Sequence, residues 1–266
     1  MSAETPSWIG LIWATLPMLA VMAVLAWRGL GQVDRLAIAA VRLTIQIALL
    51  GSILGVIFAA KSPLLMLLIA VGMTAISAYT VGSRQSSSGT RLRLEAFGAI
   101  LVAAASVMAL AIVLVLDVHP WYDARIVIPM LGMILGNSVN GVALAAERLD
   151  NDLRSGRELI ELRLSLGAHW RQASLPAARA AVAAALTPTI NSMMIAGIVA
   201  VPGMMTGQIL AGADVHRALR YQILMYLLIA GTVGISTLIL LWARLGRAFT
   251  QAHQLRCDVL EIGDSS

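Results

Sequence analysis

A series of apolar segments, each about twenty residues long, constrains this chain more than any other feature of its sequence. Each segment is long enough to cross the hydrocarbon core of a bilayer as a helix. Charged residues make up only 12% of the 266 residues, whereas soluble domains carry about a quarter, so lipid is the main solvent expected for the chain. The sequence therefore predicts an all-α, polytopic integral membrane protein with one membrane domain over residues 1–266.

Seven segments are expected to span the membrane, and the basic residues predict their orientation. The expected spans are Trp8–Trp27, Leu36–Ala60, Leu64–Gly82, Ala96–Leu116, Ile126–Ala146, Val182–Val201 and Tyr221–Leu241. With the N-terminus outside, fourteen arginines fall on the cytoplasmic side, and only Lys61, Arg125, Arg217 and Arg220 fall on the other. Basic residues gather in cytoplasmic loops, so we expect an external N-terminus and a cytoplasmic C-terminus. The positive net charge follows from the same rule and does not indicate a nucleic-acid partner.

Two cytoplasmic segments stand out, a charged one at residues 147–181 and a polar tail at residues 245–266. Within the first, Glu158–Gly167 is predicted to form a short helix that stops at Gly167. The segment at residues 147–181 is the only sizeable element expected on the cytoplasmic side.

The chain offers no ATP site of its own. Its nearest approach to a phosphate-binding loop is Gly55–Ser62, which lacks the second glycine and ends an apolar span instead of following a strand. Lys61 is the only lysine, so no other loop of this type exists in the sequence. If ATP drives the protein, we expect another polypeptide to bind ATP and Mg²⁺. This chain is then no enzyme and binds no cofactor.

Polar residues inside the expected spans are candidates for a transport pathway. Arg42 and Gln46 share a helix face, although Arg42 lies close enough to the cytoplasmic end to reach that interface. Asn137, Asn140 and Asn191 could line a polar path, or could pack against neighbouring helices beside small residues such as glycine. None of the fourteen acidic residues lies mid-span, which weighs against a carrier coupled to an ion gradient.

Two further sets of residues are weaker candidates for metal binding. The first set surrounds Pro202 and Gly203, which are predicted to end or break the sixth span, and consists of Met193, Met194, Met204, Met205 and Gln208. The second set lies in loops expected outside and consists of Asp117, His119, Asp123, Asp214 and His216. Methionines commonly fill gaps between packed helices, and polar residues are common in solvent-exposed loops. Neither set is therefore assigned to a metal site.

The charged segment resembles the coupling motif of ABC-transporter permeases. In that motif a glutamate precedes a glycine and then a Leu-Pro pair, and Glu161, Gly167 with Ala168, and Pro176 stand at the corresponding places. Leu162 and Arg163 replace two alanines of the motif, and the interval from glycine to proline is about one helical turn shorter than usual.

The stretch Leu186–Gly212, followed by Tyr221–Ile223, resembles the FetB-type iron-export permease family, which is related to plant membrane proteins of aluminium sensitivity. Gly136–Gly141 and Glu147–Arg148 fit the same family. The resemblance implies a multi-pass permease of the bacterial inner membrane that exports iron or another metal and pairs with an ABC ATP-binding subunit. Seven spans are few for a whole pathway, which favours a homodimer. An ion-coupled secondary transporter and a membrane scaffold remain the alternatives.

The resemblance also implies which residues couple the permease to its ATPase. Glu158, Glu161 and Arg163 would form a charged rim around the apolar side chains of the predicted helix. Gly167 and Ala168 would end that helix, and Pro176 would begin the chain's return toward the sixth span.

Overall fold

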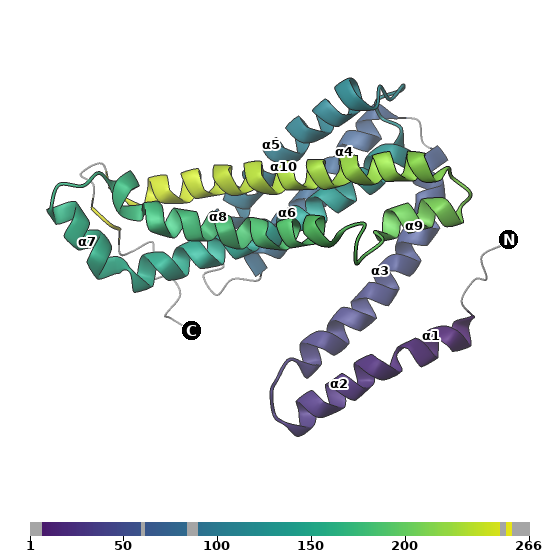
Figure 1. Ribbon diagram of the computed structural model, residues 1–266, viewed down its shortest axis with the longest axis horizontal. Coiled ribbons are helices and arrows are strands. Elements are labelled where there is room, and N and C mark those ends of the chain that lie inside the picture. Colours follow the sequence, from purple (N-terminus) through teal and green to yellow (C-terminus); the bar gives the residue numbers. More distant parts are fainter. Residues whose placement is uncertain (1–6, 60–61, 84–89, 251–253, 257–266) are drawn as a thin grey trace. The chain divides into compact units, whose positions relative to one another are not determined.

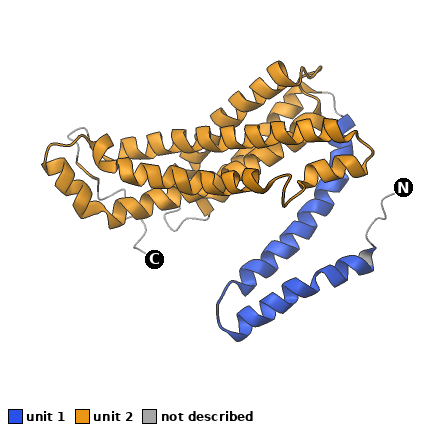
Figure 2. Ribbon diagram, viewed as in Figure 1, with its two compact units in different colours: residues 1–60 blue, residues 61–266 orange. Residues whose placement is uncertain are grey.

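The computed structural model describes residues 7–59, 62–83, 90–250 and 254–256, and the chain divides into two compact units (Figures 1 and 2). Unit 1 comprises residues 1–60 and unit 2 comprises residues 61–266. Each unit is described by itself, and the single membrane domain expected over 1–266 stays a prediction. Lys61, the lysine of the loop that resembles a phosphate-binding site, lies outside the described residues.

The described residues of unit 1 form three helices, α1 (Trp8–Ala14), α2 (Leu16–Trp27) and α3 (Val33–Ala59). The first expected span is divided at Thr15, whose hydroxyl donates to the Ile12 carbonyl oxygen at 2.7 Å. Pro17 follows in the first turn of α2, where a missing N–H costs nothing. Residues 55–59 continue α3 as a helix and form no loop.

Unit 2 contains the remaining helices. They are α4 (Pro63–Ser83), α5 (Thr90–Leu110), its π-helical continuation η1 (Ala111–Val115), α6 (Ala124–Ser155), α7 (Arg157–Ser165), α8 (Trp170–Ile195), α9 (Gly203–Leu210) and α10 (Val215–Ala248). Across the described part of both units, six helices are long and apolar enough to cross a membrane. The prediction of an α-helical polytopic membrane protein is confirmed.

The sixth expected span, Val182–Val201, differs from the helix that is observed. α8 ends at Ile195, and residues 196–202 form a turn in which Gly197 has a φ of +80° and donates its N–H to the Ala200 carbonyl oxygen at 2.9 Å. Pro202 is the N-cap of α9 and does not end α8. The predicted break is therefore present, but it begins six residues earlier, and the polar residues of α8 keep this helix out of the set of six.

Three long helices of unit 2, α6, α8 and α10, pack along one another (Figure 1). Small buried residues such as Ala146 and Ala181 line their contact faces. Gly141 marks a very close approach, because a β-carbon there would lie 2.6 Å from Val233 Cγ1 and 3.3 Å from the Ala185 carbonyl oxygen. Small residues permit such approaches between membrane helices, where packing contacts drive association.

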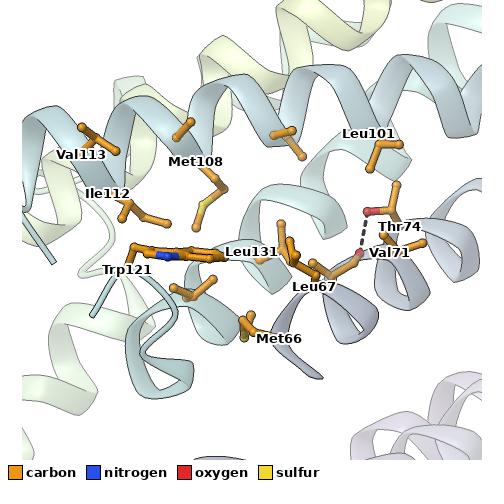
Figure 3. A pocket seen from close by; sticks show the side chains of 15 residues that line it. Met66, Leu67, Val71, Thr74, Leu101, Met108, Ile112, Val113, Trp121 and Leu131 are labelled. Atoms are coloured by element: carbon orange, nitrogen blue, oxygen red, sulfur yellow. Dashed lines mark hydrogen bonds between the residues drawn. The ribbon is translucent and has the colours of Figure 1, made fainter. Parts of the chain in front are cut away.

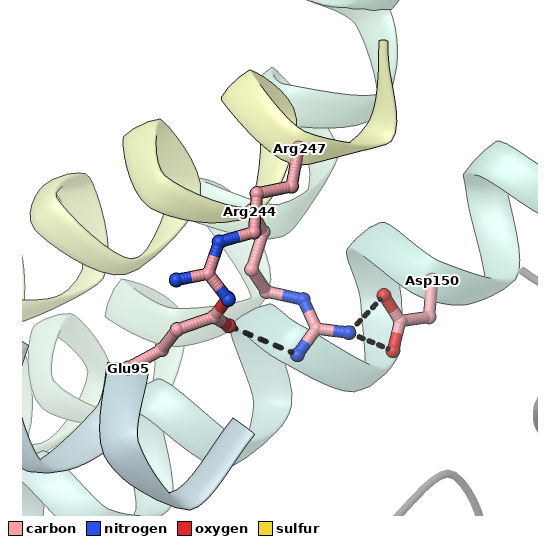
Figure 4. Close-up of polar contacts among 4 residues, drawn as sticks. All are labelled: Glu95, Asp150, Arg244 and Arg247. Atoms are coloured by element: carbon pink, nitrogen blue, oxygen red, sulfur yellow. Dashed lines mark hydrogen bonds and ion pairs between the residues drawn. The ribbon is translucent and has the colours of Figure 1, made fainter. Parts of the chain in front are cut away.

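The ends of α5, α6 and α10 meet in a cluster of four charged side chains (Figure 4). Arg244 Nη2 lies 2.7 Å from both carboxylate oxygens of Asp150, and Arg247 Nη1 lies 2.6 Å from Glu95 Oε1. Arg244 Nη1 also lies 3.7 Å from Glu95 Oε2. Glu95, Asp150 and Arg244 are nearly buried, and a buried charge is tolerated only when it is paired. We call this side of unit 2 the charged end.

Candidate coupling surface and transport pathway

The short helix predicted over Glu158–Gly167 is present as α7, which contacts α6 and α8 (Figure 1), whereas its role in coupling stays a prediction. Ile160 is only 4% exposed and belongs to an apolar cluster built from the charged-end parts of α6, α8 and α10. On the opposite side, Leu159, Leu162 and Leu166 are 52%, 55% and 79% exposed. Their spacing places them on one helix face, which we call the leucine surface. α7 is thus anchored through Ile160 and presents apolar side chains outward.

Charged residues surround the leucine surface, as the resemblance to ABC permeases implied. Glu158 is exposed, and Arg157 Nε lies 2.9 Å from Glu161 Oε1 one helical turn away. Arg163 turns toward α8, where its Nη1 donates to the Ala173 carbonyl oxygen at 3.5 Å. Glu158 and Glu161 therefore remain at the surface, while Arg163 helps hold α7 against α8.

Gly167 ends α7 in the way the sequence predicts. Its φ is +88°, its N–H donates to the Leu164 carbonyl oxygen, and the Ala168 N–H donates to the Arg163 carbonyl oxygen, both at 3.0 Å. This pair of hydrogen bonds defines a Schellman motif, which requires a left-handed residue at the position of Gly167. A β-carbon there would meet nothing within 4 Å, so backbone conformation alone demands glycine.

The segment after Gly167 differs from the sequence prediction. α8 already begins at Trp170, so Pro176 lies inside this helix and does not mark its start. The Trp170 ring stacks on Phe249 with 5.5 Å between centroids, and Leu255 is buried in the same apolar cluster. The described start of the tail thus packs on the bundle, and residues 147–181 are mostly helical. Apolar residues in both segments explain this outcome.

The asparagines predicted for a pathway lie on the outside of unit 2. Asn137 and Asn140 on α6 and Asn191 on α8 are all exposed, whereas the neighbouring Ser138 is buried. Asn137 Nδ2 donates to the Met133 carbonyl oxygen at 2.8 Å. Exposed amides within spans are costly against lipid, so this face of α6 and α8 needs a polar neighbour. In unit 1, Arg42 and Gln46 are exposed on α3.

The methionine set divides between two helices on either side of the turn at 196–202. Met193 and Met194 lie in the last turn of α8, and Met204 and Met205 lie on α9. Gln208 of α9 has a buried side-chain oxygen with no hydrogen-bond partner among the described residues. Burying an unpaired amide oxygen costs free energy, so a partner is expected for this oxygen of Gln208.

The loop carboxylates considered for a metal mostly cap helices. Asp123 accepts the Arg125 N–H and Asp214 accepts the Arg217 N–H, each at 3.0 Å. His119 Nε2 lies 3.4 Å from Asp117 Oδ1, and both side chains are exposed. His216 is exposed in the first turn of α10. Among the described residues, no three His, Cys, Asp or Glu side chains come close enough together to hold a metal ion.

An apolar cavity of about 310 Å³ lies among α4, α5, η1 and α6, with the Trp121 ring along its wall (Figure 3). The Thr74 hydroxyl in this wall donates to the Ala70 carbonyl oxygen of its own helix at 2.8 Å. The hydroxyl proton of Thr74 is therefore already used and cannot be donated to a bound molecule. Cavities of this kind stay dry and take apolar molecules, so the cavity does not suit a metal ion.

The charge cluster is the part of the structure that sequence reasoning missed. In the sequence, Glu95, Asp150 and Arg244 are charged residues near the ends of expected spans. The sequence does contain a sign of these ion pairs, because residues of opposite charge stand at the ends of three spans that are expected to lie on one side of the membrane. Pairing them requires knowing which helices are neighbours, and the sequence does not contain that information directly.

Comparison with known proteins agrees with this architecture. The profile of the family described as "Uncharacterised protein family (UPF0014)" matches residues 8–249. A UPF0014 membrane protein of Synechocystis is 35% identical over 93% of this chain and 95% of its own length. The "Probable iron export permease protein FetB" of Escherichia coli is 34% identical over 80% of this chain and 81% of its own length.

Plant proteins are also similar. ALUMINUM SENSITIVE 3 of Arabidopsis thaliana is 27% identical over 81% of this chain and 77% of its own length. No solved structure shows a significant match to the chain. The family profile and the two bacterial relatives cover most of the chain, including α7 and the spans on either side of it. This multi-pass membrane protein belongs to the UPF0014 family.

Proposed function

We propose that this chain is the membrane-spanning subunit of an ATP-driven exporter, and that a separate ATP-binding subunit docks on α7. The leucine surface is the observation that carries the proposal. It exposes Leu159, Leu162 and Leu166 at the end of unit 2 that carries the charge cluster, and charged side chains favour a position outside the hydrocarbon core. Exposed apolar patches with polar rims mark protein interfaces.

The proposed cargo is iron or another metal, moved outward across a bacterial inner membrane. The name of the Escherichia coli relative supports iron and export, and the bacterial inner membrane is part of the proposal. Amide oxygens from Asn137, Asn140, Asn191 and Gln208 are the groups that we propose for transient contact with the cargo. Hard cations accept such oxygen ligands, and weak binding suits a site that must release its cargo.

We further propose that two copies of the chain work together with two ATP-binding subunits. The exposed asparagines of α6 and α8 support this arrangement, because a second copy facing them would enclose a polar path between the two chains. In this scheme the chain binds no ATP, and the ATP-binding subunits hold ATP and Mg²⁺.

The docking proposal is tested by replacing Leu159 and Leu162 together with aspartate. We expect the co-expressed ATP-binding subunit to bind at least about a hundredfold more weakly, because two apolar contacts are lost and two charges would be buried at the interface. Co-purification at defined concentrations measures this affinity. Ser155→Asp is the matched control, since it adds a charge at an exposed position of the charged end outside the leucine surface. Equal binding by the double variant and the control would contradict docking on α7.

A further inference from the structure

A second candidate site lies at the end of unit 2 opposite the charged end. A cavity of about 570 Å³ opens there between the first turns of α10 and the end of η1. We call it the basic pocket, and its lining consists of Val115, Leu116, Asp214, Arg217, Arg220, Tyr221 and Leu224. All of these residues belong to the described part of unit 2, so the pocket does not depend on the placement of unit 1.

Two arginines give the basic pocket its charge. Arg217 and Arg220 are exposed, are one helical turn apart on α10, and make no ion pair within the described residues. Asp214 also lines the pocket, but its carboxylate Oδ1 accepts the Arg217 backbone N–H at 3.0 Å and caps α10. The pocket keeps a net positive charge, and two guanidinium groups are the preferred partners of a phosphate oxygen.

The rest of the basic pocket is apolar. Val115 and Leu116 form one wall and Leu224 continues the arginine face of α10 by another turn toward the middle of the helix. A small inorganic anion would gain nothing from these side chains. A ligand with an anionic head and a hydrocarbon chain would use both the arginines and the wall, which is the chemistry of a phospholipid.

Helix length places the basic pocket at the level of lipid headgroups. Arg220 and Arg244 are 24 residues apart on α10, which corresponds to about 36 Å along a straight helix. The hydrocarbon core is about 30 Å thick, so the pocket and the charged end reach opposite headgroup layers. Trp121, Tyr122 and Tyr221 lie toward the same end as the pocket, and such aromatic residues favour the interface.

We propose that the basic pocket binds one anionic phospholipid, with its phosphate on Arg217 and Arg220 and an acyl chain along Val115, Leu116 and Leu224. The site belongs to the leaflet on the side away from α7. It requires neither an ATP-binding subunit nor a transported cargo, so the lipid site stands independently of the transport function.

Native mass spectrometry of the purified protein, titrated with phosphatidylglycerol or phosphatidylcholine, tests this proposal. We expect the first phosphatidylglycerol to bind more tightly than phosphatidylcholine. The double variant Arg217→Gln/Arg220→Gln is expected to bind phosphatidylglycerol roughly thirtyfold more weakly, because each arginine near a membrane surface strengthens anionic lipid binding by about fivefold. Arg125→Gln is the matched control, since Arg125 is an exposed arginine at the same end of unit 2 that does not line the pocket.

Two further arms separate lipid from free anion and from loss of folding. Glycerophosphoglycerol, the headgroup without acyl chains, is expected not to displace the lipid at hundredfold excess. Displacement by it, or equal lipid binding by the double glutamine variant and Arg125→Gln, would overturn the assignment. The variant Arg217→Lys/Arg220→Lys keeps both charges and is expected to retain most of the preference for phosphatidylglycerol. If the glutamine variant does not fold, loss of that preference in the lysine variant at low salt contradicts the proposal.

Discussion

A Gly167→Val substitution is expected to lower ATP-driven transport at least tenfold while the protein still inserts into the membrane. Valine is β-branched and strongly avoids the positive φ of +88° that Gly167 adopts, at a cost of about 1–3 kcal/mol. We expect the chain to relieve this strain by unwinding the end of α7, which would displace Leu162 and Leu166 from their docking positions. ATP hydrolysis by the associated subunit would then continue without transport, and parallel assays of phosphate release and cargo movement would detect this uncoupling.

The chain contains a closely matched control for this experiment. Gly29 follows the end of α2 with a φ of +62°, its N–H donates to the Ala26 carbonyl oxygen at 3.2 Å, and the Leu30 N–H donates to the Leu25 carbonyl oxygen at 3.0 Å. Gly29→Val therefore imposes a comparable strain in the same type of helix ending, in unit 1 and outside the residues proposed to contact the cargo or the ATP-binding subunit. If both variants keep transport, or if both lose it together with protein yield, the coupling role of Gly167 is wrong.

A Gly141→Ala substitution is expected to destabilise the bundle by about 1–3 kcal/mol, because the new methyl group overlaps Val233 and neither neighbour can move freely. Val233 is fully buried and β-branched, and the second contact is the backbone carbonyl of Ala185. Thermal unfolding in detergent, followed by loss of helical circular dichroism, measures the effect.

Gly136→Ala is the paired experiment on the same helix, five residues earlier. A β-carbon at Gly136 meets nothing within 4 Å, so alanine there is expected to be neutral or to stabilise α6 by up to about 1 kcal/mol through its higher helix propensity. The two substitutions should therefore move the unfolding temperature in opposite directions. Equal destabilisation by both would show that Gly141 is not the site of close contact.

Much of the fold follows from local sequence patterns. Apolar runs of sufficient length predict spanning helices because an unpaired backbone is too costly in lipid, and all but one of the expected spans correspond to such helices. The exception contains Pro188, Asn191 and Ser192, which lower the hydropathy of α8, and its end at Ile195 depends on the turn at Gly197. The hydrogen bonds of that turn are local, within residues 195–200, and Gly197 supplies its positive φ, so the Pro-Gly pair indicated the right region but the wrong glycine.

The proposed docking surface on α7 could be predicted from the sequence only in part. Gly167 was identifiable from sequence because a helix ending in a Schellman motif needs glycine at one defined place. The sequence alone does not show that Ile160 anchors α7 while Leu162 points outward. Both are large aliphatic residues of one short helix, and only packing against α6, α8 and α10 distinguishes them. The ion pairs of Arg244 likewise depend on which helix ends become neighbours.

Transport into inside-out membrane vesicles, made from cells that produce the chain with its ATP-binding subunit, tests the central claim most directly. The account predicts that radiolabelled iron enters these vesicles only when hydrolysable ATP is supplied outside. A protonophore should not stop uptake, and the Gly167→Val chain should not support uptake while the Gly29→Val chain does. Uptake driven by a proton gradient without ATP or the ATP-binding subunit would contradict the account and identify the protein as an ion-coupled carrier.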